Sequence, residues 1–563
     1  MTQCCNEPVS DDNALFTRRT LAILLLILLV AAVLRFIYFG QSPPGLNQDE
    51  AVNAWNAYCL LKTGTDQHGV SWPVFYYRGL GSNGSTLQLY LLLPFQAIGG
   101  LNITTTRLPA AAGGVLTILL IYYVGTRLFN RKVGLVAAAL LALNPWHIQQ
   151  SRWGHEASVC PLLGLLIPAL LIWANFPLRD NVSGRQEIFR AALAGAVAGI
   201  ACYSYQAMRI FIPVFLLAIV LAMIPTFWQL VKTRRGLLCV AAFASTFTII
   251  FGAMAWQYIF HPEGIASHNE FLLIPWGGVA WPSILKDIAI RYIGHFGIDF
   301  LFINGDYNPI QSPPNIGQFH WYMLPLMLAG LLVVLVRFRQ SLSIRTLFVF
   351  MLTYPVGDIL SPSFGLHALR SAPGLCSLIL LGAVGAVAAV DWLYKRNRAL
   401  ARGLIIVFLI AGIFFNVRYL RYFYGDYNRE PDIYQVFYVD LLKACEWLGP
   451  RLDNYNAVYC TTEEMGMPYI ITLVGLSCEP DKWFREPRRF YNYDGLEWDR
   501  YFCYGKMIFM YQDVSVPDME ELRRQPSDKR ILFIVRPGEL GLTNPIYRIT
   551  DPTGKDCLWL CEL

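Results

Sequence analysis

Long apolar segments recur along the first three quarters of the chain, and they limit its possible folds more than any other feature. About eleven of them approach the roughly twenty apolar residues that a helix needs to cross a bilayer. They cover about 20–39, 108–126, 133–149, 158–176, 191–207, 210–230, 237–257, 320–336, 345–360, 373–390 and 403–419. Only 15% of the 563 residues are charged, whereas a soluble domain has about 25%. The sequence therefore predicts an α-helical polytopic membrane protein with about eleven transmembrane helices.

The segment 84–99 decides the predicted topology. It is short and contains Gln88, Pro94 and Gln96, so it is a poor membrane span. If this segment lies along the membrane surface, most Lys and Arg clusters between the spans fall on the side of the N-terminus. If it spans, every later cluster changes side. Because cytoplasmic loops collect Lys and Arg, we predict an interfacial helix here, a cytoplasmic N-terminus held by a signal anchor, and an outside-facing C-terminus.

The chain divides into two predicted domains. Residues 1–419 form the membrane domain, with a first outside loop at 40–107 and an irregular, aromatic-rich outside loop at 258–319. From residue 420 the sequence gains charges, tyrosines and short runs such as "RILFIVRPG", which are typical of strands in a soluble fold. We therefore predict that 420–563 forms a soluble α/β domain that faces outside.

Cysteine, glycine and charge patterns bear on the kind of site. The predicted soluble domain contains six cysteines, at 445, 460, 478, 503, 557 and 561. Their pattern is compatible either with disulfides or with buried free thiols. No CxxC or His-rich pattern predicts a zinc site. The formal charge of +6 fits cation-rich cytoplasmic loops and implies no nucleic acid. The glycine-rich turn at 79–84 lacks the acidic residue of a nucleotide site, although backbone amides at the N-terminus of the helix that follows it could help to hold a phosphate.

The first outside loop starts a helix with two consecutive carboxylates, in "GLNQDEAVNAWNA". Asn47 is a suitable N-cap, and Glu50 is the N3 partner of a capping box. The helix dipole favours a charged Asp49 and is expected to lower its pKa, but capping does not require Asp49, so its role stays open. Gly64 can end the helix. Apolar side chains at helical spacing predict a face that lies on the bilayer. This face comprises Ala51, Ala54, Trp55, Tyr58 and Leu61.

Short outside loops each carry one arginine despite the positive-inside bias. The arginines are Arg152, Arg209 and Arg370, and Glu156 or His367 lies near two of them in the sequence. A single arginine at the end of a span is often an interfacial anchor. Their recurrence in successive loops favours instead an anion-binding site at the membrane surface. Lipid-linked phosphates are the natural anions at that depth, and arginine binds phosphate bidentately.

Three motifs in this order resemble the GT-C glycosyltransferases that use polyprenyl-phosphate sugars. The motifs are "NQDEAVNAWNA" in the first outside loop, the stretch from "RLPAAAGG" to "WGHEAS" through the second and third spans, and "HALRSAPGLCSLILLGAVGA" near the tenth span. The resemblance covers about 15–390. It is closest to the family that contains protein O-mannosyltransferases and the aminoarabinose transferases of lipid A, and it implies a GT-C-like fold for the membrane domain.

The resemblance implies catalytic roles for the acidic residues. In such enzymes the first-loop aspartate is the catalytic base, which corresponds to Asp49, and Glu50 lies beside it. The second acidic position corresponds to Glu156, where many relatives have Asp. The family inverts the anomeric centre and is mostly independent of metals, so we expect neither a metal nor a cofactor.

The resemblance also implies a set of phosphate ligands. The basic position after the fifth span corresponds to Arg209, where many relatives have Lys. His367 and Arg370 fall in the motif before the tenth span, near the expected phosphate. Arg152, as a further outside arginine, completes the predicted donor-phosphate-binding set.

The predicted function is an inverting glycosyltransferase that uses a polyprenyl-phosphate-linked sugar. The acceptor is a hydroxyl or amine on a glycan, a lipid or a protein, and the reaction takes place at the outer face of a bacterial-type inner membrane, among membrane lipids and without nucleic acid. Two alternatives belong to other classes. One is a transporter or flippase of a lipid-linked saccharide, which predicts ionisable residues near the middle of the spans, and the other is a non-catalytic membrane subunit.

Overall fold

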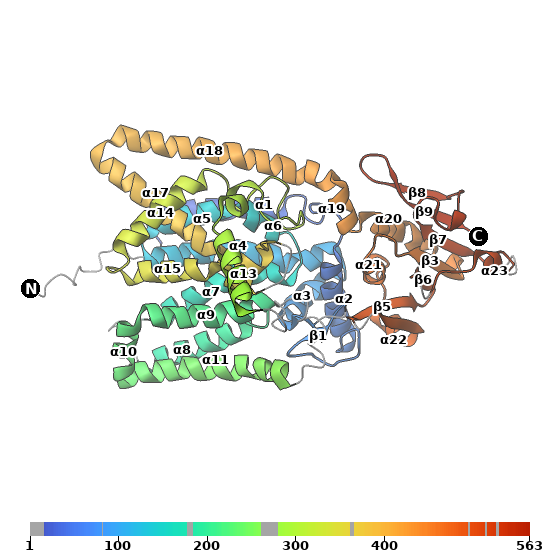
Figure 1. The fold of residues 1–563 in the computed structure, drawn as a ribbon, viewed down its shortest axis with the longest axis horizontal. Coiled ribbons are helices and arrows are strands. Elements are labelled where there is room, and N and C mark those ends of the chain that lie inside the picture. Colours follow the sequence, from blue (N-terminus) through green and yellow to red (C-terminus); the bar gives the residue numbers. More distant parts are fainter. Residues whose placement is uncertain are drawn as a thin grey trace, which may run out of the picture.

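A bundle of long helices forms one part of the molecule, and a domain built on a β-sheet forms the other (Figure 1). The computed structural model describes residues 16–80, 83–176, 184–260, 280–360, 365–493, 496–512, 515–524 and 529–563. The two parts are joined by a long helix, α18, which runs along the bundle toward the C-terminal domain. The predicted class, a helical membrane protein with a C-terminal α/β domain, is confirmed.

Each predicted span corresponds to a helix of the bundle. These helices are α1 (Arg18–Phe36), α4 (Ile103–Leu128), α5 (Arg131–Ala142), α7 (Cys160–Trp173), α8 (Gly184–Ala201), α9 (Gln206–Ala222), α11 (Arg234–Phe260), α14 (Met323–Arg337), α15 (Leu342–Thr353), α17 (Leu375–Arg396) and α18 (Arg398–Tyr424). Among the described residues, six helices are long and apolar enough to cross a membrane, and a bent helix pair would add a seventh. The multi-pass class is thus confirmed, whereas the predicted number of spans is not.

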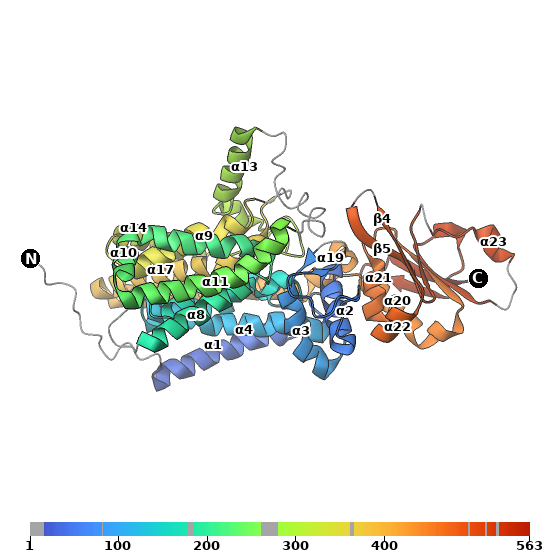
Figure 2. The same ribbon diagram turned by 90° about the horizontal axis from the view of Figure 1, so that it is seen from below.

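Two helices lie across the bundle rather than along it (Figure 2). The first, α10 (Ile224–Lys232), follows α9 at an angle of 86° and closes the end of the bundle away from the C-terminal domain. The second, α13 (Trp281–Gly294), projects sideways from the bundle and exposes Trp281. The loop predicted to be irregular therefore contains a helix, which is followed by a π-helical turn, η4 (Asp299–Ile303). Its segment 261–279 lies outside the described residues.

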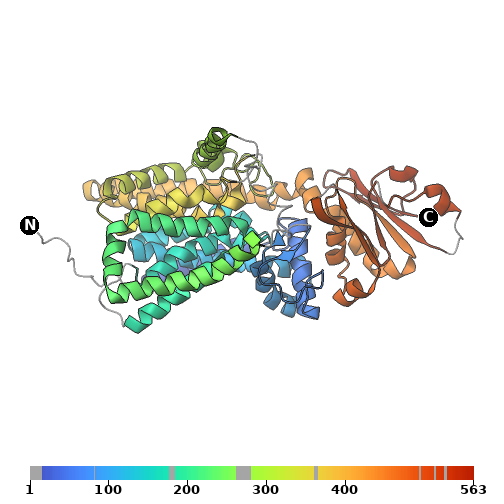
Figure 3. The same ribbon diagram turned by 60° about the horizontal axis from the view of Figure 1, so that its bottom comes forward.

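The first outside loop forms a small layer between the bundle and the C-terminal domain (Figure 3). It contains α2 (Gln48–Thr63), β1 (Tyr77–Arg78), β2 (Asn83–Gly84) and α3 (Thr86–Gly99). The segment whose topology was in question, 84–99, is the helix α3, which lies beside α2 at the end of the bundle.

The prediction that one face of α2 lies on the bilayer is wrong. Ala51, Ala54 and Trp55 are fully buried, and the Trp55 ring packs edge-on against Trp483 of the C-terminal domain, with ring centroids 6.0 Å apart. The helical spacing of apolar residues does mark the buried face of α2, but a protein domain rather than lipid covers it. The helix ends at Gly64, which adopts the left-handed conformation (φ 74°) that glycine tolerates.

The C-terminal domain is built on a seven-stranded mixed sheet with the strand order β4-β5-β6-β3-β7-β9-β8. The strands are β3 (Ala457–Thr461), β4 (Arg488–Tyr493), β5 (Leu496–Tyr504), β6 (Met507–Met510), β7 (Ile531–Val535), β8 (Tyr547–Thr550) and β9 (Asp556–Glu562). β3 is parallel to both β6 and β7, and β7 is buried along its whole length, as expected of a central parallel strand.

Short helices complete the C-terminal domain. They are α19 (Pro431–Val436), α20 (Val439–Leu448), α21 (Pro468–Gly475), α22 (Pro480–Arg485) and α23 (Met519–Arg523). α21 and α22 contact α2, so this domain also packs on the first outside loop. The six cysteines of the domain are free thiols. The boundary at residue 419 stays a prediction, and α18 continues past it.

Candidate active site

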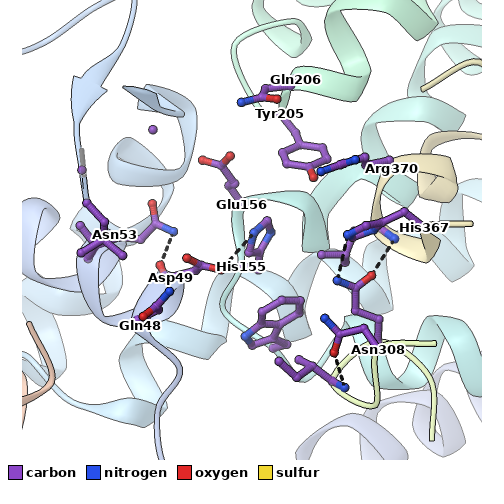
Figure 4. Close-up of a pocket in the computed structure, with 18 of the residues that line it drawn as sticks. Gln48, Asp49, Asn53, His155, Glu156, Tyr205, Gln206, Asn308, His367 and Arg370 are labelled. Carbon is purple, nitrogen blue, oxygen red and sulfur yellow. Dashed lines mark hydrogen bonds and ion pairs between the residues drawn. The ribbon is translucent and has the colours of Figure 1, made fainter. Parts of the chain in front are cut away.

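A pocket of about 340 Å³ lies where the bundle meets the first outside loop (Figure 4). Its lining residues are Gln48, Asp49, Val52, Asn53, Tyr77, Gly79, Leu80, Gly84, Trp153, His155, Glu156, Tyr205, Gln206, Asn308, Ile310, Gln311, His367, Leu369 and Arg370. These residues come from segments that are far apart in the chain. Carboxylate, amide, imidazole and guanidinium groups therefore share one space at the end of the bundle.

Asp49 is placed at the pocket by the capped start of α2. Asn47 Oδ1 accepts a hydrogen bond from the Asp49 amide (3.0 Å), and Glu50 Oε2 accepts one from the Asn47 amide (3.1 Å), which confirms the predicted capping box. The Asp49 side chain is open to the pocket and 46% exposed. Its position inside the pocket still removes part of its hydration, and this desolvation, with the charge of Glu50, raises the pKa of Asp49 to about 6. The expected lowering by the helix dipole is thus outweighed, and Asp49 is a stronger base than an ordinary aspartate.

Glu50 holds this end of the bundle together. Its buried carboxylate accepts hydrogen bonds from Arg107 Nε (2.7 Å), Arg107 Nη2 (2.8 Å) and the Gly154 amide (2.7 Å), in addition to the Asn47 amide. Glu50 is not among the residues that line the pocket. These four hydrogen bonds occupy the lone pairs of the Glu50 carboxylate. The structure therefore argues against the predicted catalytic role of Glu50 and assigns it a structural role.

Glu156 lines the same pocket as Asp49, as the prediction required. It begins the short 3₁₀ helix η2 (Glu156–Val159) between α6 (Pro145–Gln150) and α7, and its Oε2 accepts a hydrogen bond from the Ser85 amide at the start of α3 (2.8 Å). This amide belongs to the helix start that was suggested as a phosphate site. Because the Ser85 amide already donates its hydrogen bond to the Glu156 carboxylate, it is not free to bind a phosphate.

His155 is a pocket residue to which the sequence assigned no role, although it lies in the motif "WGHEAS". Its ring packs against Trp153 and Tyr205, with centroids 4.6 and 5.6 Å apart, and its Nε2 lies 3.9 Å from Asp49 Oδ2. Burial, together with the His367 and Arg370 side chains, lowers the pKa of His155 to about 3. His155 is therefore neutral at physiological pH. Its position directly before Glu156 is the only signal that could have suggested it.

Other pocket residues were not predicted, because amide side chains and tyrosines occur throughout the chain and form no recognisable motif. They are Gln48, Asn53, Tyr77, Tyr205, Gln206, Asn308 and Gln311. Tyr77 donates a hydrogen bond to Asn53 Oδ1 (2.6 Å), and Asn53 Nδ2 donates to the Asp49 carbonyl (2.7 Å). These bonds tie the wall formed by β1 to the first turn of α2.

Arg370 supplies the positive charge of the opposite wall. It lies on α16 (Ala368–Ser371), and its side chain is 15% exposed at the pocket. His367 lines the pocket beside it, but burial and the charge of Arg370 lower the pKa of His367 to about 3. The predicted role of His367 as a phosphate ligand is therefore limited to that of a neutral group.

Two buried aspartates hold the segment that carries His367 and Arg370. Asp358 Oδ2 accepts a hydrogen bond from the His367 amide (2.9 Å), and Asp306 Oδ2 accepts one from the Ala368 amide (2.6 Å). Asp358 Oδ1 also lies 3.8 Å from Arg370 Nη1. The loop predicted at 258–319 thus contributes to the site through Asp306, which fixes the backbone under the arginine.

Arg209 lies near the pocket but is not among its lining residues. It is on the first turn of α9, and its guanidinium stacks on the Tyr258 ring at 4.5 Å from the centroid. Gln206, the first residue of the same helix, does line the pocket. The predicted phosphate role of Arg209 therefore stays a prediction, and Arg370 is the better-placed cation.

The predicted phosphate role of Arg152 is wrong. Arg152 is fully buried, lies outside the lining of the pocket, and donates hydrogen bonds to carbonyls at the C-terminal end of α1. The acceptors are the carbonyl oxygens of Leu34, Arg35, Ile37, Tyr38 and Ser42, at 2.7–3.3 Å. A helix leaves its last carbonyls without intrahelical partners, and a cation there also matches the helix dipole. Arg152 thus caps α1.

We expect R152A to destabilise the bundle by about 2–5 kcal/mol, because several buried carbonyls lose charged donors. The measurement is thermal unfolding of the purified protein in detergent. R127A, which removes an exposed arginine at the end of α4, is the matched control and should leave the unfolding midpoint in place. An R152A protein with an unchanged midpoint would refute the capping role.

A metal site is not evident. In the part of the chain that the structure describes, no three His, Cys, Asp or Glu side chains are arranged to hold a metal ion. The expectation of a metal-independent site stays a prediction.

Known proteins share both a sequence segment and the fold. Residues 85–256 match the family model described as dolichyl-phosphate-mannose-protein mannosyltransferase. ArnT from Cupriavidus metallidurans in the apo state has a TM-score of 0.54 and 12% identity, over 96% of this chain and 98% of that chain. The same protein bound to undecaprenyl phosphate has a TM-score of 0.50 and 13% identity, over 96% and 97% of the two chains.

A third similar structure is the archaeal oligosaccharyltransferase AglB from Archaeoglobus fulgidus, in complex with an inhibitory peptide and a dolichol-phosphate. It has a TM-score of 0.49 and 14% identity, over 81% of this chain. The chain spans 64% of the length of that protein. A search of curated protein sequences gives no match.

The family model matched by residues 85–256 and the fold shared with ArnT both indicate the GT-C superfamily of glycosyltransferases. The long apolar helices and the shared fold make the chain a multi-pass integral membrane protein. Neither a transporter nor a non-catalytic subunit is supported by these comparisons.

Proposed function

We propose that the chain is an inverting glycosyltransferase that moves a sugar from a polyprenyl-phosphate donor to an acceptor. The observation that carries the proposal is that Asp49 and Arg370 line one pocket although 321 positions separate them in the chain. A base and a cation in one pocket are the two groups that a direct displacement at a sugar phosphate requires. Asp49 comes from the first outside loop, and Arg370 comes from the segment before α17.

The proposed reaction is a single displacement. The acceptor oxygen or nitrogen attacks the anomeric carbon while Asp49 takes its proton, and the bond between that carbon and the phosphate oxygen breaks. The electron pair leaves with the phosphate, where Arg370 stabilises the negative charge. Glu156, the second carboxylate of the pocket, accepts hydrogen bonds from substrate hydroxyls. Because attack and departure occur on opposite faces of the sugar, the anomeric centre is inverted.

The polyprenyl-phosphate donor is supported by the similar proteins and by the chemistry of the pocket. The ArnT structure that shares this fold contains undecaprenyl phosphate, and the family model is described by a dolichyl-phosphate sugar. In the proposed arrangement the prenyl chain lies in the bilayer beside the bundle. Its phosphate then reaches the Arg370 wall at the end of the bundle, with Arg209 close by as a second cation.

An outer-face location is supported by α10 and by the cation-rich turns at the same end of the bundle. α10 is amphipathic, exposes Trp228 and carries Lys232 at its end, as interfacial helices do. The cation-rich turns 232–235 and 395–398 lie at this end of the bundle, and cytoplasmic loops collect such cations. The pocket and the C-terminal domain lie toward the opposite end, which we therefore propose faces outside.

The test is reconstitution of the purified chain in lipid nanodiscs. Radiolabelled polyprenyl-phosphate hexoses and pentoses are supplied as donors, and the envelope fraction of the source cells is supplied as the acceptor. We expect release of free polyprenyl phosphate together with transfer of label to the envelope fraction. Lack of both with every donor would reject the proposed function.

A further inference from the structure

The neutral His155 and the carboxylate of Asp49 form a pair with defined hydrogen-bonding roles. The Ala157 amide donates a hydrogen bond to His155 Nδ1 (2.9 Å). Because a neutral imidazole carries one proton, an accepting Nδ1 leaves that proton on Nε2. The Nε2–H group therefore faces the Asp49 side of the pocket as a donor, and Asp49 in its charged form is only an acceptor.

The separation of the two groups leaves room for a third atom. Nε2 and Asp49 Oδ2 are 3.9 Å apart, which is too long for a direct hydrogen bond. An oxygen placed about 2.9 Å from Nε2 and about 2.7 Å from Oδ2 closes this triangle with an angle of roughly 90° at the oxygen. Such an atom would accept from His155 and donate to Asp49 at the same time.

We infer that the acceptor nucleophile is an alcohol hydroxyl, held between His155 Nε2–H and Asp49. This inference rests on the proposed function and narrows its acceptor. A hydroxyl has one proton and two lone pairs. The proton goes to Asp49, one lone pair accepts from His155, and the second lone pair remains for attack on the anomeric carbon.

Other acceptor groups cannot accept a hydrogen bond from His155, donate one to Asp49 and keep a lone pair for attack. A neutral amine has a single lone pair, which the His155 hydrogen bond would occupy, and an ammonium has none. An amide nitrogen donates to Asp49 but does not accept from His155. A phosphate has no proton to donate when it is fully ionised, and the carboxylates of Asp49 and Glu156 repel it.

The proton and electron balance follows from these roles. The hydroxyl oxygen forms a bond to the anomeric carbon, and its proton passes to Asp49 Oδ2. The bond from the anomeric carbon to the phosphate oxygen breaks, and its electron pair leaves with the polyprenyl phosphate. His155 keeps its proton throughout, so it binds and orients the hydroxyl and is not the base.

The surroundings of His155 hold its ring in this orientation. The ring packs on Trp153 and meets the edge of Tyr205, and its side chain is only 12% exposed. As the N-cap of η2, it is also anchored through Nδ1. A residue in this place therefore has two separable tasks, capping through one nitrogen and donating through the other.

Two substitutions separate these tasks. Asparagine is among the best N-cap residues, so H155N keeps the bond to the Ala157 amide but lacks a donor at the Nε2 position. Glutamine is long enough to place an amide N–H near that position, so H155Q restores a donor while it weakens the cap. We expect H155N to lower kcat/KM for the acceptor about 10-fold or more, with little change in KM for the donor, and H155Q to recover most of the loss.

The experiment uses the nanodisc assay with the envelope fraction as the titrated acceptor, and it adds chemical analysis of the labelled product. We expect the sugar on an alcohol oxygen, in a linkage that contains no phosphorus and survives the mild acid that cleaves glycosyl phosphates. A glycosyl phosphate or an N-linked product would overturn the inference, as would an H155N enzyme with unchanged acceptor kinetics. Each of these results requires a wild-type enzyme that transfers sugar, so only a complete lack of transfer counts against the proposed function itself.

Discussion

The D49N variant is expected to transfer sugar about 10²–10⁴ times more slowly than the wild type, because it lacks the base that takes the acceptor proton. Asparagine has nearly the same shape as aspartate, so the capped start of α2 and the pocket should persist. The measurement is the rate of release of polyprenyl phosphate in nanodiscs at saturating donor. D287N, on the exposed surface of α13, is the matched control and should keep the wild-type rate.

The pH dependence tests the same residue independently. The pKa of Asp49 is raised to about 6 by burial and by Glu50, and only the ionised form can accept a proton. Activity should therefore fall as the pH drops through about 6, and this fall lies below the titration of Glu156, whose pKa burial raises to about 7. The charged or titratable groups around Asp49 include Glu50, His155, Glu156, Tyr77 and Tyr438. A fully active D49N enzyme, or a wild-type profile that is flat down to pH 4, would remove Asp49 as the base.

The R370A variant is expected to lower kcat by about 10²–10³-fold, because the charge that develops on the leaving phosphate loses its cation. R370K keeps a positive charge but not the bidentate geometry, so it should recover only part of the activity. The assay is again the release of polyprenyl phosphate, with thermal unfolding as the check on folding.

Arg209 is the alternative candidate for the principal phosphate ligand. If Arg370 is the principal phosphate ligand, R209A should reduce the rate less than R370A does. R421A, which removes an exposed arginine near the end of α18, controls for the loss of any positive charge on this side. A larger effect of R209A than of R370A would return the main phosphate role to the residue that the family resemblance favours.

Local sequence signals predicted the positions of the bundle helices and both caps of α2. Spans follow from the local density of apolar residues, and the capping box follows from the spacing of Asn47 and Glu50, which lie on one helix turn. Hydrogen bonds within one turn need no knowledge of the fold. The same is true of Gly64, whose left-handed conformation ends α2.

The surroundings of several side chains depend on long-range packing and could not be predicted from the local sequence. Trp55 faces the C-terminal domain rather than lipid, and hydropathy does not distinguish these two apolar surroundings. Arg152 and Arg370 occupy similar places at the ends of spans. One caps α1 and the other lines the pocket, because the fold brings different partners to each.

Within the site, the sequence predicted the acidic and basic residues of recognisable motifs and missed most of the residues that only line the pocket. Asp49, Glu156, His367 and Arg370 were selected, and all four line the pocket. His155 was not selected. Its proposed role depends on its distance from Asp49, and the fold rather than the local sequence determines that distance. The position of a proton on one ring nitrogen likewise depends on the Ala157 amide.

The anomeric configuration of the transferred sugar tests the central claim most directly. That claim is a single displacement, with Asp49 and Arg370 acting in one pocket on opposite sides of the reacting carbon. The measurement is the one-bond carbon–hydrogen coupling at the anomeric carbon of the product, compared by NMR with that of the donor. The account predicts inversion, with an α-linked product from a β-linked donor or the reverse. Retention of configuration would contradict it, because a single displacement from the face opposite the phosphate always inverts the anomeric centre.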